Sequence, residues 1–188
     1  QYVIDELIDW TNVPEDPIFQ MTFPQRGMLD SLQLTELTDL ITHNAPDDIL
    51  NATVRRIQNG LNPHPAGQVE LNVPMVNGDP LPGMQHKYRE TVLFFPSQGQ
   101  TCHAYCSYCF RWPQFVGLDE LKFASNEAEG LVNYLKEHKE VRSVLFTGGD
   151  PLIMRTSVLQ AYIKALLSPE LEHITSIRLG TKATAYWP

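Results

Sequence analysis

The feature that most constrains the fold is an alternation of apolar, strand-like runs with helical patterns in the second half of the chain. Residues 91–95, 142–146 and 174–179 are short apolar runs typical of buried strands. Helical spacing separates them, over about 126–138 and 156–167. A β-α-β-α-β order requires parallel strands with right-handed crossovers. We therefore predict an α/β fold with three parallel strands, too few to close a barrel.

The helix expected over 126–138 illustrates the local signals. Asn126 is placed to serve as N-cap with Glu129 at N3, the pattern of a capping box. Its apolar face would consist of Leu131, Tyr134 and Leu135. Such a face predicts that the helix packs on the sheet.

The first part of the chain is expected to be helical and irregular. Apolar residues recur at helical spacing after Asp30 and Ser31, either of which can be the N-cap; they are Leu32, Leu34, Leu37, Leu40 and Ile41. A second helix is predicted over 47–59, with Gly60 at the C′ position. Its apolar stripe comprises Leu50, Val54, Ile57 and Leu61. The segment 62–83 is rich in proline and glycine and is expected to wrap along another part of the molecule.

These patterns divide the chain into two regions, a helical and irregular one over residues 1–85 and the strand–helix alternation over residues 86–188. The chain begins at Gln1 without an initiating methionine and ends abruptly at Pro188. We therefore expect it to be a piece of something longer, in which the second region is truncated.

Composition narrows the class of protein. With 188 residues, 43% hydrophobic and 19% charged, the chain is expected to form a globular core. A formal charge of −8 argues against general nucleic-acid binding. Neither a membrane-length apolar run nor a secretory signal is found in this sequence, so we expect a cytoplasmic protein with no membrane partner.

The chain has three cysteines, all in one short segment after the first predicted strand. Cys102, Cys106 and Cys109 have the spacing C-x3-C-x2-C. Three thiolates can hold a cubane iron–sulfur cluster with one iron free of protein ligands, whereas an electron-carrying cluster usually has four. Since an open iron can bind a substrate or cofactor, the spacing predicts a catalytic [4Fe-4S] cluster.

Other uses of the cysteines stay open at this point. An odd number at short spacing does not suggest a disulfide framework. A structural zinc site needs four ligands, and His103 is the nearest candidate for the fourth. His103 adjoins Cys102, however, which makes ligation of one ion by both residues awkward. Inert thiols are the other alternative.

A second candidate site, Gly148-Gly149-Asp150-Pro151, follows the second predicted strand. The glycines leave the backbone open to a ligand, and Asp150 could hold a ligand's ammonium group. Alternatively, Asp150 and Pro151 are simply the N-cap and N1 residues of a helix. The functional interpretation gains weight because parallel strands bring this motif to the same sheet edge as the cysteines.

Together these residues resemble the radical S-adenosylmethionine (SAM) enzymes, and more closely the lysine 2,3-aminomutase family. The resemblance covers about residues 86–182 and is weaker over 14–85. It rests on His86-x-Tyr88 and Val92-Leu93, on the cysteine loop with Cys-Phe-Arg at 109–111, on Val-Leu-Phe-Thr-Gly-Gly-Asp-Pro-Leu at 144–152, and on Ile-Arg-Leu-Gly-Thr-Lys at 177–182. It implies a partial (β/α) barrel of the radical SAM type after a mainly helical N-terminal region.

The resemblance implies a [4Fe-4S] cluster on Cys102, Cys106 and Cys109 whose open iron binds S-adenosyl-L-methionine. The residues implied to contact this cofactor are Tyr108, Arg111, Gly148, Gly149 and Asp150. Arg111 would pair with its carboxylate, and Gly148 to Asp150 would hold its ammonium group. Reductive cleavage would give a 5′-deoxyadenosyl radical that starts amino-group migration on an amino acid.

In the family, pyridoxal 5′-phosphate carries the migrating nitrogen. Tyr88 matches a residue beside its site, but Thr91 stands where the family commonly has a phosphate-binding arginine, and the segment 95–101 is slightly longer than expected. The family's Schiff-base lysine lies beyond position 188. Arg178 is interpreted equally well as a structural residue or as a ligand contact.

The implied partners are a small amino-acid substrate and a reducing electron donor such as flavodoxin or ferredoxin, with a homo-oligomer as a further expectation. Two alternatives stay open. One is a radical enzyme of different chemistry that lacks pyridoxal phosphate, and the other is a non-enzymatic iron–sulfur redox protein.

Overall fold

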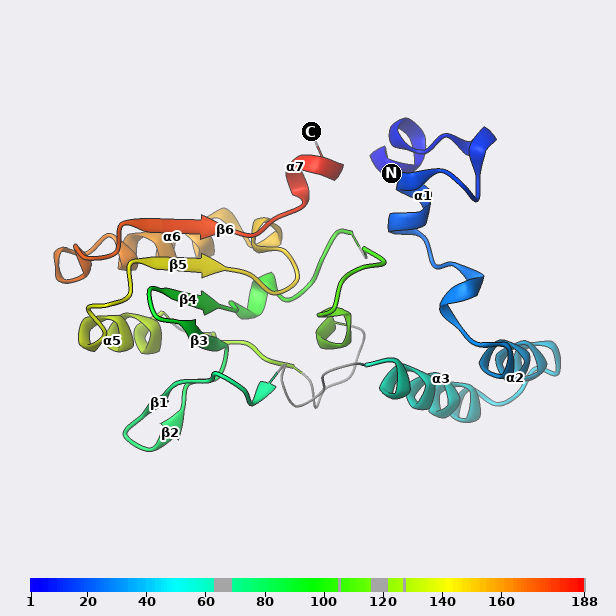
Figure 1. Cartoon of the computed structure of the whole chain (residues 1–188), viewed down its shortest axis with the longest axis horizontal. Helices are drawn as coiled ribbons and strands as arrows, with labels where there is room; N and C mark the ends of the chain where they lie inside the picture. The colour runs from blue at the N-terminus through cyan, green and yellow to red at the C-terminus, as the bar shows by residue number, and fades with distance from the viewer. Residues whose placement is uncertain (63–68, 105, 116–121, 127, 188) are drawn as a thin grey trace. The chain divides into compact units, whose positions relative to one another are not determined.

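The computed structural model describes residues 1–62, 69–104, 106–115, 122–126 and 128–187 (Figure 1). Parts of two predicted segments, residues 63–68 and residue 127, lie outside this range. The chain divides into two compact units, one of residues 1–64 with 105–113 and one of residues 65–104 with 114–188. The domain boundary near residue 85 stays a prediction.

The first unit is helical, with α1 (Pro17–Thr22), α2 (Ser31–Thr42) and α3 (Asp47–Leu61). The predicted start of α2 is confirmed. The Asp30 carboxylate accepts a hydrogen bond from the Gln33 N–H (2.8 Å), and the Gln33 side chain accepts one from the Asp30 N–H (3.1 Å). This capping box satisfies two backbone N–H groups near the helix start.

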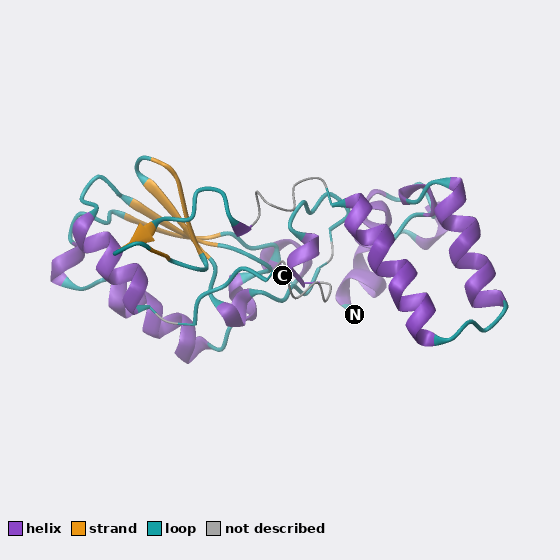
Figure 2. Cartoon of the chain, turned by 90° about the horizontal axis from the view of Figure 1, so that it is seen from below, coloured by secondary structure: helices purple, strands orange, loops and turns teal. Residues whose placement is uncertain are grey.

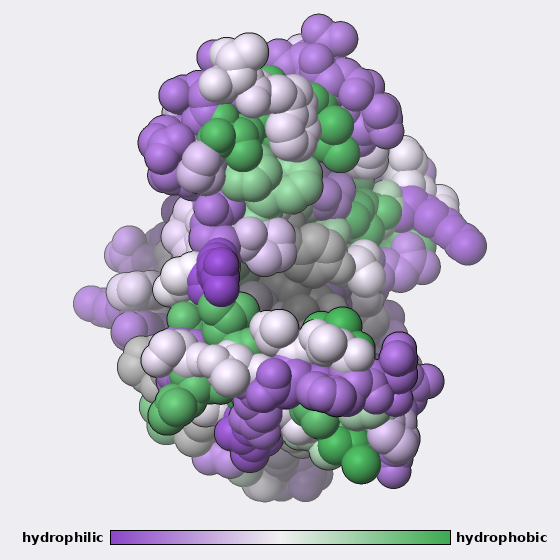
Figure 3. Space-filling model, turned by 90° about the vertical axis from the view of Figure 1, so that its right-hand side faces the viewer, coloured by the Kyte–Doolittle hydropathy of each residue, from purple (hydrophilic) through white to green (hydrophobic). Residues whose placement is uncertain are grey.

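The apolar stripes of α2 and α3 range from half-buried to exposed within this unit. Ile57 is the buried residue of α3, and α2 has none among its described residues. Leu32 is 80% exposed and Ile41 63% exposed. Figure 3 shows apolar surface, in green, next to hydrophilic surface on the face it presents. The expectation that these stripes are packing surfaces is met in part within the unit, by Ile57 and by the half-buried residues of the two stripes, which are Leu34, Leu37, Leu40, Leu50 and Val54.

The predicted end of the second helix was wrong by two residues. Gly60 lies inside α3, which continues to Leu61 and has Asn62 as its C-cap. A Cβ on Gly60 would meet no atom within 4 Å, and Gly60 is not among the glycines with positive φ. The position therefore needs no glycine, because the backbone is ordinary helix rather than a left-handed C′ turn.

We predict that Gly60→Ala stabilises the first unit by about 0.5–1 kcal/mol, since alanine loses less backbone entropy than glycine in a helix. Urea denaturation followed by helical circular dichroism measures the change. If Gly60→Ala destabilises the unit instead, Gly60 has the left-handed backbone conformation of a C′ residue.

The second unit is built on a four-stranded sheet in the order β3-β4-β5-β6 (Figure 1). The strands are β3 (Met84–Tyr88), β4 (Thr91–Phe94), β5 (Ser143–Phe146) and β6 (Ser176–Leu179). β4, β5 and β6 are parallel and in register, which confirms the predicted parallel unit. The antiparallel edge strand β3 was not predicted, and the sheet is therefore mixed.

The remaining elements connect or flank this sheet. A short antiparallel pair, β1 (Met75–Val76) and β2 (Asp79–Pro80), lies within the proline-rich segment. Among its described residues, the helices of the unit are α5 (Glu129–Glu137), α6 (Thr156–Leu166) and α7 (Ala183–Tyr186). Single 3-10 turns occupy Ser97–Gly99, Pro151–Ile153 and Pro169–Leu171. In the described part of the chain, no helix has both the length and the apolar character needed to cross a membrane.

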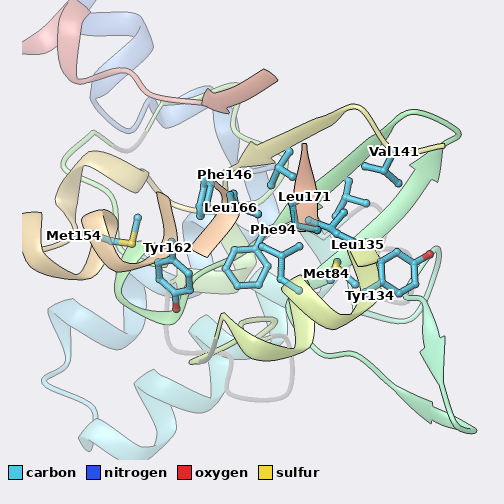
Figure 4. Packing of buried hydrophobic residues seen from close by; sticks show 13 residues of the cluster. Met84, Phe94, Tyr134, Leu135, Val141, Phe146, Met154, Tyr162, Leu166 and Leu171 are labelled. Carbon is cyan, nitrogen blue, oxygen red and sulfur yellow. The ribbon is translucent and has the colours of Figure 1, made fainter. Parts of the chain in front are cut away.

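The core lies between the sheet and helices α5 and α6 (Figures 2 and 4). Alternate strand residues point toward it, and Val92, Phe94, Val144 and Phe146 are at most 1% exposed. Phe94, Phe146 and Tyr162 of α6 form aromatic contacts with centroids 5.3–5.9 Å apart. The intervening residues, including Thr91 and Ser143, therefore lie on the other face of the sheet.

Helix α5 confirms its predicted face but not its predicted start. Leu131, Tyr134 and Leu135 are buried as expected. The helix begins at Glu129 after Ala128, which makes no side-chain cap. The capping box expected from Asn126 and Glu129 was therefore wrong, because Glu129 is the first helical residue rather than the third.

Candidate functional site

The three cysteines form no disulfide, and each is half-buried. Cys102 belongs to the second unit, eight residues after the last residue of β4, whereas Cys106 and Cys109 belong to the first unit. The absence of a disulfide among them leaves all three sulfurs available as ligands.

Cys106 and Cys109 lie in a tight turn. The Cys109 N–H donates to the Cys106 carbonyl (2.9 Å), and the Ser107 N–H donates to the carbonyl of Met21 in α1 (2.7 Å). Burial raises the pKa of the Cys109 thiol. Burial also lowers the pKa of Arg111 to about 10, so its guanidinium is still charged at neutral pH. Arg111 lies over the Phe110 ring, 5.0 Å from its centroid, and its charge favours the thiolate of Cys109.

The two glycines after β5 are required by close packing on the segment before Cys102. Gly148 has a φ of +128°, and a Cβ there would overlap the Gln100 side chain. A Cβ on Gly149 would overlap the backbone carbonyl of Thr101. The N–H groups of Gly149 and Asp150 donate to the Gly99 carbonyl (3.1 Å each), and that of Asp150 also donates to Thr101 (2.9 Å). The sequence therefore needs glycine here to join the loops that follow β4 and β5.

Asp150 is a buried carboxylate, 1% exposed, with three donors. It accepts hydrogen bonds from the Leu152 N–H (2.9 Å), the Lys182 N–H (2.8 Å) and the Thr181 hydroxyl, which is 2.8 Å from both oxygens. Asp150 thus caps the 3-10 turn that starts at Pro151, as its helix-cap interpretation expected. It also ties the loop after β5 to the loop after β6.

His103 lies close to this carboxylate. Its Nδ1 is 3.8 Å from Asp150 Oδ2, and its side chain is 10% exposed. The ring stacks on Trp187, with centroids 5.1 Å apart and planes at 18°. One ligand atom each from Cys102, His103 and Asp150 lie within 4.8 Å of one another. The ligand atoms of Cys102 and His103 are therefore close together, although ligation of one ion by these adjacent residues is not tested.

A cavity of about 450 Å³ lies beside the same segment of the second unit. Gln100, Thr101, Gln114 and Lys122 contribute polar groups to its lining, and Phe123 contributes an apolar ring. This volume is in the range of small-molecule sites.

Thr91, Tyr88 and Arg178 meet at the start of the strands. Tyr88 pairs with Thr91 across β3 and β4. Arg178 donates from Nη2 to the Thr91 hydroxyl (3.3 Å) and from Nε to the Ser143 hydroxyl (3.0 Å). The guanidinium from β6 therefore lies beside the Thr91 and Ser143 hydroxyls.

Sequence reasoning missed two contributors to these sites. Thr181 was quoted only as part of the resemblance, yet its hydroxyl contacts both oxygens of Asp150. Gln100 was not singled out, yet its side chain fills the space that a Cβ on Gly148 would need. A polar residue two positions after the third strand was a usable signal for Thr181, whereas nothing in the pattern pointed to Gln100.

This arrangement defines an α/β protein with its candidate ligands in the loops that follow parallel strands. Comparison with curated proteins finds similarity to lysine 2,3-aminomutases. The chain is 33% identical to L-lysine 2,3-aminomutase of Bacillus subtilis over 109 residues, which is 58% of this chain and 22% of that protein. It is 32% identical to L-lysine 2,3-aminomutase of Acetoanaerobium sticklandii over 113 residues, 60% of this chain and 26% of that protein.

A provisionally named L-lysine 2,3-aminomutase of Aquifex aeolicus is 40% identical over 106 residues, 56% of this chain and 27% of that protein. No family model matches the chain. The resemblance seen in the sequence is confirmed: the chain is similar to lysine 2,3-aminomutases over 56–60% of its residues. It spans about a quarter of the length of these curated relatives.

We predict that Gly149→Ala destabilises the second unit by about 1–3 kcal/mol, because the methyl group overlaps backbone that must move. Gly130→Ala within α5 is the matched control, since its Cβ would lie 3.4 Å from the flexible Leu81 side chain. Chemical denaturation followed by tryptophan fluorescence compares them. Equal behaviour of the two variants would contradict the tight packing at Gly149.

Proposed function

We propose that this chain carries the cluster-binding part of a radical SAM enzyme of the aminomutase type. The observation that carries the proposal is the C-x3-C-x2-C segment after a parallel strand, in a chain related to lysine 2,3-aminomutases. The proposed substrate is a small amino acid, and the proposed partner is a low-potential electron donor. A partial radical SAM barrel is the fold that this proposal requires.

The thiols fit a [4Fe-4S] cluster by their chemistry. Cys102, Cys106 and Cys109 are unoxidised and half-buried, which suits thiolate ligands shielded from bulk water. Arg111 places positive charge next to Cys109 and so offsets part of the negative charge of a thiolate-bound cluster. With SAM bound, such a cluster supplies the electron that generates a 5′-deoxyadenosyl radical.

The chain's own residues would bind and orient SAM. The ammonium group of SAM is a donor and needs acceptors, which the carbonyl oxygens of Gly148 and Gly149 and the carboxylate of Asp150 can provide. The N–H groups of Gly149 and Asp150 are already bonded to the loop after β4, so they hold the motif in place without competing for that role. Arg111 is proposed to pair with the carboxylate of SAM, and Tyr108, which is 56% exposed, to contact the cofactor.

We predict that anaerobic reconstitution loads about four irons and four sulfides per chain, and that alanine at Cys102, Cys106 or Cys109 abolishes this. Iron and sulfide assays together with visible absorption measure the load. Ser107→Ala in the same turn is the control, because its structural hydrogen bond uses the backbone N–H. Full iron loading in a cysteine variant would contradict the three-thiolate site.

Pyridoxal 5′-phosphate also fits residues of this chain. A phosphate dianion needs a cationic or hydrogen-bonding cradle. Arg178 supplies a guanidinium between the hydroxyls of Thr91 and Ser143, with Tyr88 paired next to Thr91. We therefore propose that Arg178 provides the positive charge that Thr91 lacks, and that this polar group holds the phosphate.

We predict that Arg178→Gln weakens pyridoxal phosphate binding at least about 10-fold, the loss expected for charge-assisted hydrogen bonds. Binding of pyridoxal, which has no phosphate, should not change, and equilibrium dialysis measures both. Arg142→Gln is the control, since that guanidinium donates to the His173 carbonyl instead. An equal loss of affinity for pyridoxal, or no loss of affinity for pyridoxal phosphate, would show that Arg178 has only a structural role in the sheet.

A further inference from the structure

Three side chains, that of Asp150 and two near it, are of types that bind metal ions. The proposed iron–sulfur cluster uses only one of them, Cys102, as a ligand. The sulfur of Cys102, a ring nitrogen of His103 and a carboxylate oxygen of Asp150 all lie within 4.8 Å of one another. These three residues belong to the second unit. Thiolate, imidazole and carboxylate are the ligand types that Zn²⁺ takes in proteins.

His103 gives the independent sign of a ligand. Neither of its ring nitrogens has a hydrogen-bond partner in the described part of the chain, although its side chain is nine-tenths buried. A buried polar nitrogen without a partner is costly. Stacking on Trp187 fixes the ring plane, and Nδ1 is 3.8 Å from Asp150 Oδ2.

The distances suit a tetrahedral ion after a small contraction. Zn–S is about 2.3 Å and Zn–N or Zn–O about 2.0–2.2 Å, so ligand atoms on one zinc lie about 3.3–3.8 Å apart. The observed limit of 4.8 Å requires movements of about 1 Å, within reach of side-chain rotations at Cys102 and His103.

Asp150 is prepared for this role by its hydrogen bonds. An ionised carboxylate has about four acceptor sites. The Leu152 N–H, the Thr181 hydroxyl and the Lys182 N–H use three, which leaves one for a metal. Such outer hydrogen bonds orient metal ligands and tune their affinity.

We propose that Cys102, His103 and Asp150 bind one Zn²⁺, with its fourth position open to water or a ligand. Binding replaces the thiol proton of Cys102, which now points to the Ala104 carbonyl (3.0 Å), and releases that proton to solvent. The thiolate and the carboxylate together neutralise the divalent charge. Since Cys102 is also a proposed cluster ligand, zinc and the cluster would exclude each other.

Cobalt(II) titration of the metal-free, reduced chain tests the proposal, because cobalt reports tetrahedral thiolate ligation by its absorption. We expect one cobalt per chain, displaced by one zinc. His103→Asn should weaken binding at least about 10-fold, as should Cys102→Ser. His43→Asn, an exposed histidine of the first unit, should not.

The double variant Cys106→Ser, Cys109→Ser separates this site from the cluster. It should lose iron–sulfur reconstitution but keep cobalt binding, whereas His103→Asn should keep the cluster and lose cobalt. Loss of cobalt in the double variant would place the ion on the three cysteines and overturn the proposal. Unchanged affinity in His103→Asn would overturn it as well. If the wild-type chain binds cobalt but cannot be reconstituted with iron and sulfide, the iron–sulfur proposal is contradicted and the zinc proposal is not.

Discussion

The parallel, in-register pairing of β4, β5 and β6 is the constraint on which the second unit depends. Because Phe94, Phe146 and Leu179 are aligned partners, the loops that follow these strands leave the sheet at one edge. This brings Cys102, Asp150 and Thr181 into one neighbourhood, although 79 residues separate the first from the last. The same alignment gathers Thr91, Ser143 and Arg178 at the opposite end.

The loops at the first edge are joined by backbone contacts rather than by side chains alone. The carbonyls of Gly99 and Thr101 accept hydrogen bonds from Gly149 and Asp150, at a distance that only glycine at 149 permits. The slightly longer segment before the cysteines is thus part of the site's framework, because it provides the surface on which the Gly-Gly turn packs. A ligand held by Asp150 would be positioned by three loops at once.

Charge distribution gives the two ends of the sheet different chemistry. At the edge with Cys102, a buried carboxylate and a thiol favour cations, whether a metal ion or the ammonium group of a cofactor. At the other end, the Arg178 guanidinium between two hydroxyls favours an anion such as a phosphate. A cofactor set containing both kinds of group would find a matching site at each end.

The sequence by itself determined the parallel strands, the cap of α2 and the buried face of α5, because apolar periodicity and capping residues act locally. It also contained the three-cysteine spacing and the resemblance to lysine 2,3-aminomutases. It could not place the start of α5 or the end of α3, since Asn126 and Gly60 carry cap-like signals that the helices do not use. Only the tertiary structure brought His103 to Asp150 and Arg178 to Thr91, because these contacts depend on strand register and loop packing between residues far apart in the chain.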